Sequence, residues 1–324
     1  MVNNANWLLP EGVEEILPTE ALKLEMLRRK IVDDFTAKEF SLVMPPVMEF
    51  VDALLTGTGK ELDTQTYKFM DQQSNRMLGI RADITPQVAR IDSHYLSNND
   101  VNRLCYTSTV LRAQPAEMGG QREVLQCGVE IFGVSDTSAD KEVISAMLET
   151  LALANINDVT ISLAHVDIYR ALVKDSKISE AEEMRLRDVL LRKSTPDLND
   201  LNRQLGQSLL DAFITLIKLQ GDATILLKAE AELPKLPAIS NAISELDEVV
   251  GYIKSAYPKV SVHLDLADVA GYRYYTGIKH SAYIPGRGRT VAKGGRYDHI
   301  GAHFGRSRPA TGFSADLKTL VKLA

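Results

Sequence analysis

The sequence predicts an α+β fold, in which an antiparallel sheet flanked by helices is interrupted by a helical insertion. Segments with alternating apolar residues occur before residue 174 and return after residue 256, whereas the residues between them show helical periodicity. The order of strands, then helices, then strands differs from that of alternating βαβ units. We therefore expect one domain over 1–324, with a sheet body at 1–173 and 257–324 and a helical insertion at 174–256.

The first expected element is a helix that Thr19 caps and that continues to about Phe40. Its apolar residues recur at three- and four-residue steps and predict one buried face, formed by Leu24, Leu27, Ile31 and Phe35. A short strand from Ser41 then stops at Pro45, because proline has no amide hydrogen to donate to a sheet. A hairpin is expected at 68–80, with polar turn residues at 71–75.

Most later segments are expected to extend this sheet. Strands are predicted at 102–111, 123–133, 159–163, 260–266 and 278–284, and helices at 140–154 and from about residue 315 onward. Loops are expected at 57–59 and 114–121, where glycine and proline gather. Gly294 and Gly295 are expected to form a tight turn.

Composition excludes several classes of protein. The 37 Lys and Arg against 43 Asp and Glu give a net charge of −6, which is unlike a generic nucleic-acid binder. Two cysteines are too few to stabilise a fold of this size through disulfide bonds, and we expect Cys105 and Cys127 to be reduced thiols. We expect a cytoplasmic protein without a signal peptide or a membrane-spanning helix. None of the six histidines has the sequence context of a metal site, and the phosphate-binding glycine motifs are missing, so we expect no metal and no cofactor.

The segment 79–87 carries Asp83 and Thr85, two residues apart and on one face if the chain is extended. A carboxylate beside a hydroxyl can receive an ammonium group. The alternative is that the pair only caps a helix that starts at Pro86.

A second polar group lies on two strand-like segments. Arg112 closes the first, and Gln126, Gly128 and Glu130 share one face of the second, where the small Gly128 leaves room between two polar side chains. Polar residues on an otherwise apolar strand cost stability unless they bind something or face water. A solvated face is therefore the alternative to a binding site.

The third segment combines tyrosines and glycines at 271–277 and 294–298, and includes Tyr274 and Tyr275. Aromatic side chains beside glycines can wall a small-ligand pocket, although a tyrosine-rich strand pair with a glycine turn would give the same pattern. A nearby basic cluster fits either an anion site or a solvated loop, and it consists of Arg287, Arg289, Lys293 and Arg296.

In this order, the segments resemble the catalytic domain of histidyl-tRNA synthetase over nearly the whole chain. The matching segments are 44–49 for class II motif 1, which in that family lies at a dimer interface, 112–133 for motif 2, 309–314 for the start of motif 3, and Tyr274-Tyr275 with 294–298 for the two histidine-specific motifs. The resemblance implies a class II aminoacyl-tRNA synthetase-like sheet. It also leads us to expect no anticodon-binding domain and no tRNA partner, because the matching part ends after motif 3.

Asp83 stands where the synthetases have Glu, and the other departures from their pattern fall on the ATP contacts. Gln114 and Pro115 replace the acid and the second arginine of motif 2, Thr319 replaces the arginine of motif 3, and Ala270 replaces the arginine that promotes adenylate formation. Each lost contact to developing charge typically costs about 10²–10³ in rate. We expect no catalytic residues in this chain.

The residues for the amino acid are kept, and the chain resembles the regulatory subunit of ATP phosphoribosyltransferase. The resemblance implies that L-histidine is an allosteric ligand held at its ammonium, imidazole and carboxylate groups by Asp83, Thr85, Arg112, Gln126, Glu130, Tyr274 and Tyr275. It further implies a short-form catalytic subunit as partner, which the chain activates and makes sensitive to histidine in the first step of histidine biosynthesis. A homodimer within a hetero-octamer is expected from the family.

Two other functions stay open at this point. One is a histidine-activating ligase that acts on an acceptor other than tRNA, against which Pro115, Ala270 and Thr319 count. The other is an interaction module whose pocket binds nothing.

Overall fold

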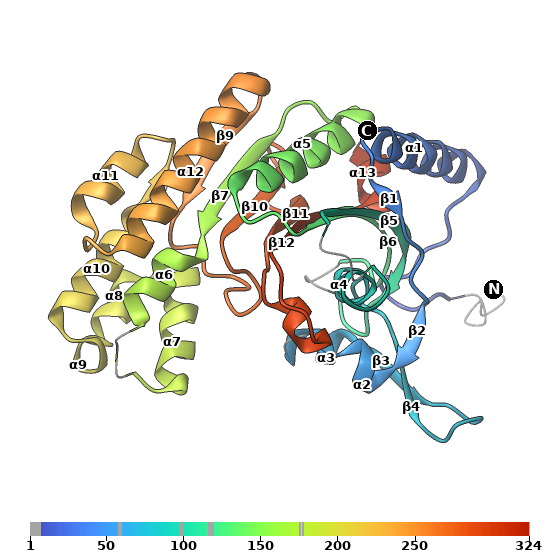
Figure 1. The fold of residues 1–324 in the computed structure, drawn as a ribbon, viewed down its shortest axis with the longest axis horizontal. Helices are drawn as coiled ribbons and strands as arrows, with labels where there is room; N and C mark the ends of the chain where they lie inside the picture. Colours follow the sequence, from blue (N-terminus) through green and yellow to red (C-terminus); the bar gives the residue numbers. More distant parts are fainter. Residues whose placement is uncertain are drawn as a thin grey trace, which may run out of the picture. The chain divides into compact units, whose positions relative to one another are not determined.

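The computed structural model describes residues 8–57, 60–96, 100–115, 120–174, 176 and 178–323, without the side chains of residues 60 and 61. The chain, drawn in Figure 1, divides into two compact units. Unit 1 comprises Met1–Gly133, Ala146–Ile156 and His299–Ala324, and unit 2 comprises Val134–Ser145 and Asn157–Asp298. The predicted loops at 57–59 and 114–121 lie partly outside the described residues.

Unit 1 is built on four neighbouring strands in the order β1-β5-β6-β12 and on a small sheet in the order β2-β4-β3. Their bounds are Ser41–Leu42 for β1, Asn102–Leu111 for β5, Glu123–Phe132 for β6, Ala310–Asp316 for β12, Met48–Phe50 for β2, Met77–Ile80 for β4 and Tyr67–Met70 for β3. These strands confirm the predicted hairpin and the predicted strand pair at 102–111 and 123–133. Strand β1 pairs in parallel with β5.

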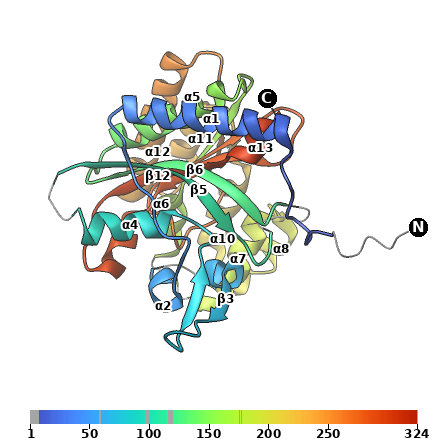
Figure 2. The ribbon, with the colours of Figure 1, turned by 90° about the vertical axis from the view of Figure 1, so that its right-hand side faces the viewer.

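The sheet of unit 1 has an apolar face and a polar face, and helices lie on both. Helices α1 (Pro18–Ala37) and α13 (Leu317–Leu323) lie on one face of β5 and β6, and α4 (Thr85–His94) lies on the other (Figure 2). On the α1 side, Phe35 packs edge-on against Phe313. The remaining helices are α2 (Val51–Leu54), α3 (Lys60–Gln65) and the 3-10 helix η2 (Ile300–Phe304).

Helix α1 buries the four predicted apolar residues, but the predicted Thr19 cap is wrong. The helix begins at Pro18, and the N-cap Leu17 makes no side-chain cap. Proline suits the first helical turn because its fixed φ is helical and no amide hydrogen is needed there. The last predicted helix starts at Leu317, after β12 has continued through Asp316.

Unit 2 contains neighbouring strands in the order β11-β10-β7-β9-β8. Their bounds are Thr290–Arg296 for β11, Ile278–Tyr283 for β10, Thr160–His165 for β7, Ser261–Asp265 for β9 and Gln220–Gly221 for β8. Strand β8 lies inside the stretch predicted as helical, and β9 runs parallel to β7. The sheet is thus mainly but not entirely antiparallel.

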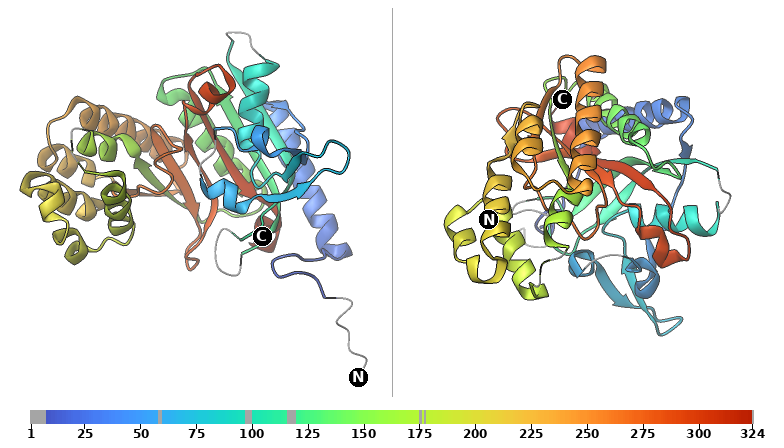
Figure 3. Two further views of the ribbon diagram at one scale, coloured as in Figure 1. Left: turned by 90° about the horizontal axis from the view of Figure 1, so that it is seen from below. Right: turned by 60° about the vertical axis from the view of Figure 1, so that its left-hand side comes forward.

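Unit 2 contains the helices α6 to α12 and the first part of α5, whose residues from Ala146 onward belong to unit 1. Their bounds are Thr137–Leu153 for α5, Val166–Val173 for α6, Glu180–Leu191 for α7, Thr195–Asn199 for α8, Asn202–Leu205 for α9, Gln207–Lys218 for α10, Ile225–Glu232 for α11 and Pro237–Ala256 for α12. The long α12 packs on β7, β9 and β10 through its predicted apolar stripe, and α7 to α11 form a group of short helices (Figure 3). The predicted insertion at 174–256 stays a prediction.

The predicted turn at Gly294 and Gly295 is wrong, because both residues lie within β11 and pair with β10. Gly295 has a φ of +153°, and a Cβ there would lie 2.6 Å from the carbonyl oxygen of Ile278. Glycine is therefore needed here for a close approach within the sheet. Among the described helices, none is both long and apolar enough to cross a membrane.

Candidate functional site

Asp83 lies directly before α4, at the edge of the polar face of unit 1. Its Oδ1 accepts hydrogen bonds from the Ile84 amide and from Nε2 of Gln126, both at 2.8 Å. Gln126 in turn accepts from the Ile84 amide through Oε1, at 3.1 Å. The second carboxylate oxygen of Asp83 makes no hydrogen bond to a described residue, and the side chain is half-buried. Gln126 thus fixes a carboxylate that keeps one oxygen available.

Thr85 is the first residue of α4, so the expectation of an extended chain at this point is wrong. The side chain does not cap the helix; its hydroxyl donates to Oε1 of Glu130 at 2.8 Å. Because the proton of Thr85 is committed to a carboxylate, its lone pairs are left to accept from a ligand. The alternative of a simple helix cap is therefore wrong for Thr85.

Glu130 is the most buried acidic group of this face, with 1% of its surface exposed. Its Oε1 also accepts from the hydroxyl of Tyr106 at 3.1 Å. Its register partner on β12 is Gly312, where a Cβ would overlap with Oε2 of Glu130. A glycine on the neighbouring strand is therefore what gives this carboxylate its place.

The alternative of a solvated face is wrong, because Gln126 and Glu130 are both buried. The space that Gly128 was expected to leave is filled by Tyr106, whose hydroxyl would lie 2.6 Å from a Cβ at that position. Burial and then the charges of Glu130 and Asp83 raise the pKa of Tyr106 well above its ordinary value. Both carboxylates thus act on one buried hydroxyl, which makes this a negatively charged site suited to a cation.

Arg112 follows the last residue of β5 and is half-buried. Its Nε donates to the carbonyl oxygen of Ala82 at 3.4 Å, beside Asp83, and it forms no ion pair with a described residue. The position of the missing motif 3 arginine holds Thr319, whose hydroxyl donates to Asp316 at 2.6 Å at the start of α13. The neighbouring Lys318 is paired with Glu123. Arg112 thus places a guanidinium against the backbone of the residue that precedes Asp83.

Tyr274 and Tyr275 lie in unit 2, in the loop between β9 and β10. The Tyr275 ring packs against two glycines, since a Cβ on Gly271 or Gly295 would lie 3.0 or 2.9 Å from it. The Tyr274 ring stacks on Tyr297 at 5.2 Å between centroids and meets Tyr275 edge-on. These tyrosines and glycines thus pack together in unit 2, and the small-ligand pocket expected there stays a prediction.

This chain is similar to known proteins in both sequence and structure. Residues 12–320 match the sequence model of the histidyl-tRNA synthetase family. The ATP phosphoribosyltransferase regulatory subunit of Pseudomonas putida F1 is 44% identical over 98% of this chain and 80% of its own length. The chain belongs to the family of ATP phosphoribosyltransferase regulatory subunits. A relative of the same name from Thioalkalivibrio sulfidiphilus is 43% identical over the whole of this chain and 83% of its own length.

A crystal structure of an ATP phosphoribosyltransferase regulatory subunit/histidyl-tRNA synthetase from Bacillus halodurans matches with a TM-score of 0.86 and 27% identity. The match covers 98% of this chain and 83% of that one. These comparisons confirm the predicted synthetase-like fold class and the predicted membership of the regulatory subunits.

Two residues of the site, Tyr106 and Gly312, were not predicted from the sequence. Tyr106 is the register partner of Gly128, and the pairing of β5 with β6 would have placed an aromatic side chain over that glycine. Gly312 required knowledge that β12, distant in sequence, lies beside β6.

Arg81 also went unrecognised as a structural residue. It is fully buried and donates to the carbonyl oxygens of Pro45 and Thr109 at 2.7 and 2.8 Å. Desolvation lowers its pKa, and these carbonyl oxygens take the place of a carboxylate partner. Arg81 thereby fixes the backbone two residues before Asp83.

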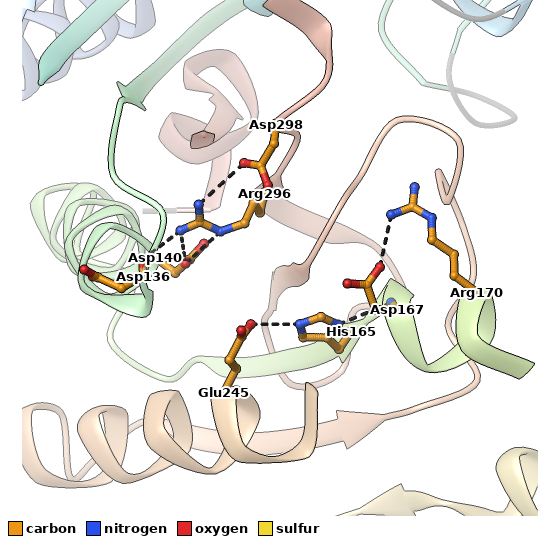
Figure 4. A network of polar contacts seen from close by, with 8 residues as sticks. All are labelled: Asp136, Asp140, His165, Asp167, Arg170, Glu245, Arg296 and Asp298. Atoms are coloured by element: carbon orange, nitrogen blue, oxygen red, sulfur yellow. Dashed lines mark hydrogen bonds and ion pairs between the residues drawn. The ribbon is translucent and has the colours of Figure 1, made fainter. Parts of the chain in front are cut away.

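Arg296 is not part of a basic surface loop, because it is buried and paired with Asp140 at 2.5 Å (Figure 4). It also donates to the carbonyl oxygens of Val134 and Asp136, at 2.9 Å each. Attraction to Asp140 raises the pKa of Arg296 against the effect of its burial. Arg296 therefore holds the residues before α5 within unit 2, whereas the other members of the predicted cluster, Arg287, Arg289 and Lys293, are exposed. Among the described residues, no group of three or more His, Cys, Asp or Glu side chains is placed to hold a metal ion.

Proposed function

We propose that this chain is the non-catalytic regulatory subunit that activates a short-form ATP phosphoribosyltransferase catalytic subunit and transmits feedback inhibition by L-histidine. Membership of the regulatory-subunit family supports this role. The step would be the first of histidine biosynthesis, with the chemistry carried out in the partner. The replacement of ATP-contacting residues by Pro115, Ala270 and Thr319 supports a subunit without chemistry of its own.

The polar face of unit 1 suits each group of histidine. The free oxygen of Asp83 and the lone pairs of Thr85 would accept from the ammonium group, and Gln126 would hold Asp83 in place. Glu130 would accept from an imidazole N–H, and Arg112 would pair with the carboxylate group. Tyr274 and Tyr275 stay predicted members of the ligand set.

The observation that carries this proposal is the buried carboxylate of Glu130. Burying a charge costs free energy unless it is paired or strongly hydrogen-bonded. Thr85 and Tyr106 supply two hydrogen bonds to one oxygen, and Gly312 leaves space for the other. A protein with no use for the charge would be more stable with an apolar residue here.

The assembly that we propose is a homodimer within a hetero-octamer. Exposed apolar side chains around β1 and β2 support an interface in unit 1, and they are Leu42, Met44, Val47 and Met48. Met44 is 80% exposed. Light scattering of the chain alone tests this point, because a Met44→Glu variant should reduce the dimer mass to that of a monomer, whereas Met184→Glu should not.

Calorimetric titration of L-histidine into the chain tests the binding function. Binding that is weakened in Glu130→Gln, together with a change in partner kinetics on mixing, is the expected result. No heat of binding, or unchanged partner kinetics, would overturn it. The free buried thiols of Cys105 and Cys127 support a reducing cytoplasmic setting for these measurements.

A further inference from the structure

The loop that carries Tyr274 and Tyr275 is held in part by hydrogen bonds of its own backbone. Its turn is closed by hydrogen bonds from the amides of Tyr274 and Tyr275 to the carbonyl oxygen of Gly271, at 2.8 and 2.9 Å. Gly271 has a φ of +71°, which favours glycine. The carbonyl oxygens of Tyr272 and Tyr275 also accept hydrogen bonds from a side chain of another element.

Arg170 of α6 supplies both donors. Its Nη2 donates to the carbonyl oxygens of Tyr272 and Tyr275, at 2.6 and 2.5 Å. Asp167, one turn earlier on α6, receives a hydrogen bond from Nη1 of Arg170 at 3.3 Å and restrains the guanidinium (Figure 4). A planar guanidinium can hold two acceptors in fixed directions, which a lysine ammonium does less well.

Tyr272 extends the contact from α6 to α7. Its ring meets Tyr169 of α6 edge-on at 5.5 Å, and the Arg187 guanidinium of α7 lies 4.1 Å from its centroid. Tyr169 in turn donates from its hydroxyl to Glu183 of α7 at 3.2 Å. The side chain of Tyr272 is therefore held by two helices while its carbonyl group is held by Arg170.

Helix α6 is itself fixed at its first turn. His165 accepts from the Asp167 amide through Nδ1, which leaves Nε2 as the protonated nitrogen, facing Glu245 of α12 at 3.0 Å (Figure 4). The hydrogen bond to His165 lowers the pKa of Glu245. Arg170 thus projects from a helix with a defined position on α12.

We propose that Arg170 is a positioning residue for histidine binding. Through Arg170, α6 and α7 hold the loop that carries Tyr274 and Tyr275 and so set its affinity for L-histidine. This rests on the proposed function, in which Tyr275 takes part in binding the imidazole. The backbone of Tyr275 is one of the two groups that Arg170 holds, so a change at Arg170 moves Tyr275 without removing it. Because Tyr272 joins the same loop to α7, the contact also gives α7 a means of sensing an occupied site.

Calorimetry with L-histidine on the full chain tests this assignment. Arg170→Ala should raise the Kd by about 3- to 30-fold, as expected for a residue that acts through another, and Arg170→Lys should recover part of the loss. Arg187→Ala should raise the Kd less, because it leaves the two carbonyl contacts intact. Arg192→Ala is the matched control, since Arg192 follows α7, is exposed and pairs with Asp188 and Asp197.

A double-mutant cycle with Tyr275→Phe separates positioning from a general effect on stability. If Arg170 acts through Tyr275, Arg170→Ala should cost less affinity in the Tyr275→Phe background than in the wild type. Equal costs in both backgrounds, or a Kd unchanged by both Arg170→Ala and Arg187→Ala, would overturn the assignment. If Glu130→Gln and Tyr275→Phe themselves leave the Kd unchanged, the proposed function fails instead.

Discussion

Gly312 and Glu130 are register partners on neighbouring strands, and the carboxylate of Glu130 occupies the space where a side chain at position 312 would lie. We predict that Gly312→Ala abolishes measurable histidine binding, because the added methyl group displaces Glu130. Overpacking of this kind should also destabilise the protein by about 1–3 kcal/mol. Calorimetry and thermal unfolding measure the two effects. Gly251→Ala is the control, since nothing lies within 4 Å of a Cβ there.

Removing the charge of Glu130 or the hydroxyl of Tyr106 should weaken histidine binding to different degrees. A hydrogen bond to a charged group contributes about 1.5–3 kcal/mol, so Glu130→Gln should raise the Kd by about 10- to 150-fold. Tyr106→Phe keeps the ring over Gly128 and should have a smaller effect. An equal Kd for the wild type and Glu130→Gln would contradict this role, and the exposed Glu230→Gln serves as control.

Stability should fall in mild acid because of His280. This residue is fully buried on β10, neither ring nitrogen has a hydrogen-bond partner in the described structure, and burial lowers its pKa to about 3. The unfolded chain binds this proton near pH 6.5, so the contribution of His280 to stability is complete above that pH and is lost as pH falls from 6.5 towards 3. At pH 5 the loss should be about 2 kcal/mol.

Urea unfolding at pH 7.5 and 5.0 measures this effect in the wild type, in His280→Leu and in His299→Leu. The difference between the two pH values should shrink in His280→Leu and stay as in the wild type in His299→Leu, whose histidine is exposed. An undiminished difference in His280→Leu would show that other groups cause the acid sensitivity.

The buried ion pair of Arg296 and Asp140 should stabilise the folded protein and take no part in ligand binding. Removing one partner of a buried pair leaves an uncompensated charge and typically costs about 3–5 kcal/mol. Arg296→Met and Asp140→Asn should both lower the midpoint of urea unfolding, whereas Arg28→Ala at a surface pair should not. If either buried variant unfolds at the wild-type midpoint, the structural role assigned to this pair is wrong.

Histidine-dependent exchange between ATP and pyrophosphate should be undetectable. The positions that would contact ATP carry Pro115, Ala270 and Thr319, and Thr319 is engaged with Asp316. Exchange that persists in Glu130→Gln would come from a contaminating synthetase. Exchange that disappears in that variant would instead establish the alternative of a histidine-activating ligase.

Much of the fold followed from local pattern. The stripe on α12 and the strand pair β5 and β6 were predictable because their apolar periodicity persists over many residues. Strand β8 was not, since two residues give no period, and the placement of Gly294 and Gly295 in β11 depended on a close approach to β10. Glycine in a strand and glycine in a turn look alike in sequence.

The residue types of the candidate site were predictable, but not their partners. Asp83, Thr85 and Glu130 were identified by type and spacing together with the family resemblance. The contact between Thr85 and Glu130 joins residues 45 positions apart, and Gly312 comes from a strand far along the chain. Such contacts follow from strand register, which the local sequence does not specify.

Inhibition of the assembled complex by L-histidine tests directly whether Glu130 forms part of the regulatory histidine site. We would reconstitute the short-form catalytic subunit with the wild-type chain and with Glu130→Gln, and measure ATP phosphoribosyltransferase activity over a histidine titration. Both complexes should be activated, and the Glu130→Gln complex should need about 10- to 150-fold more histidine for the same inhibition. Equal inhibition of both complexes would contradict the assignment of the histidine site to Glu130.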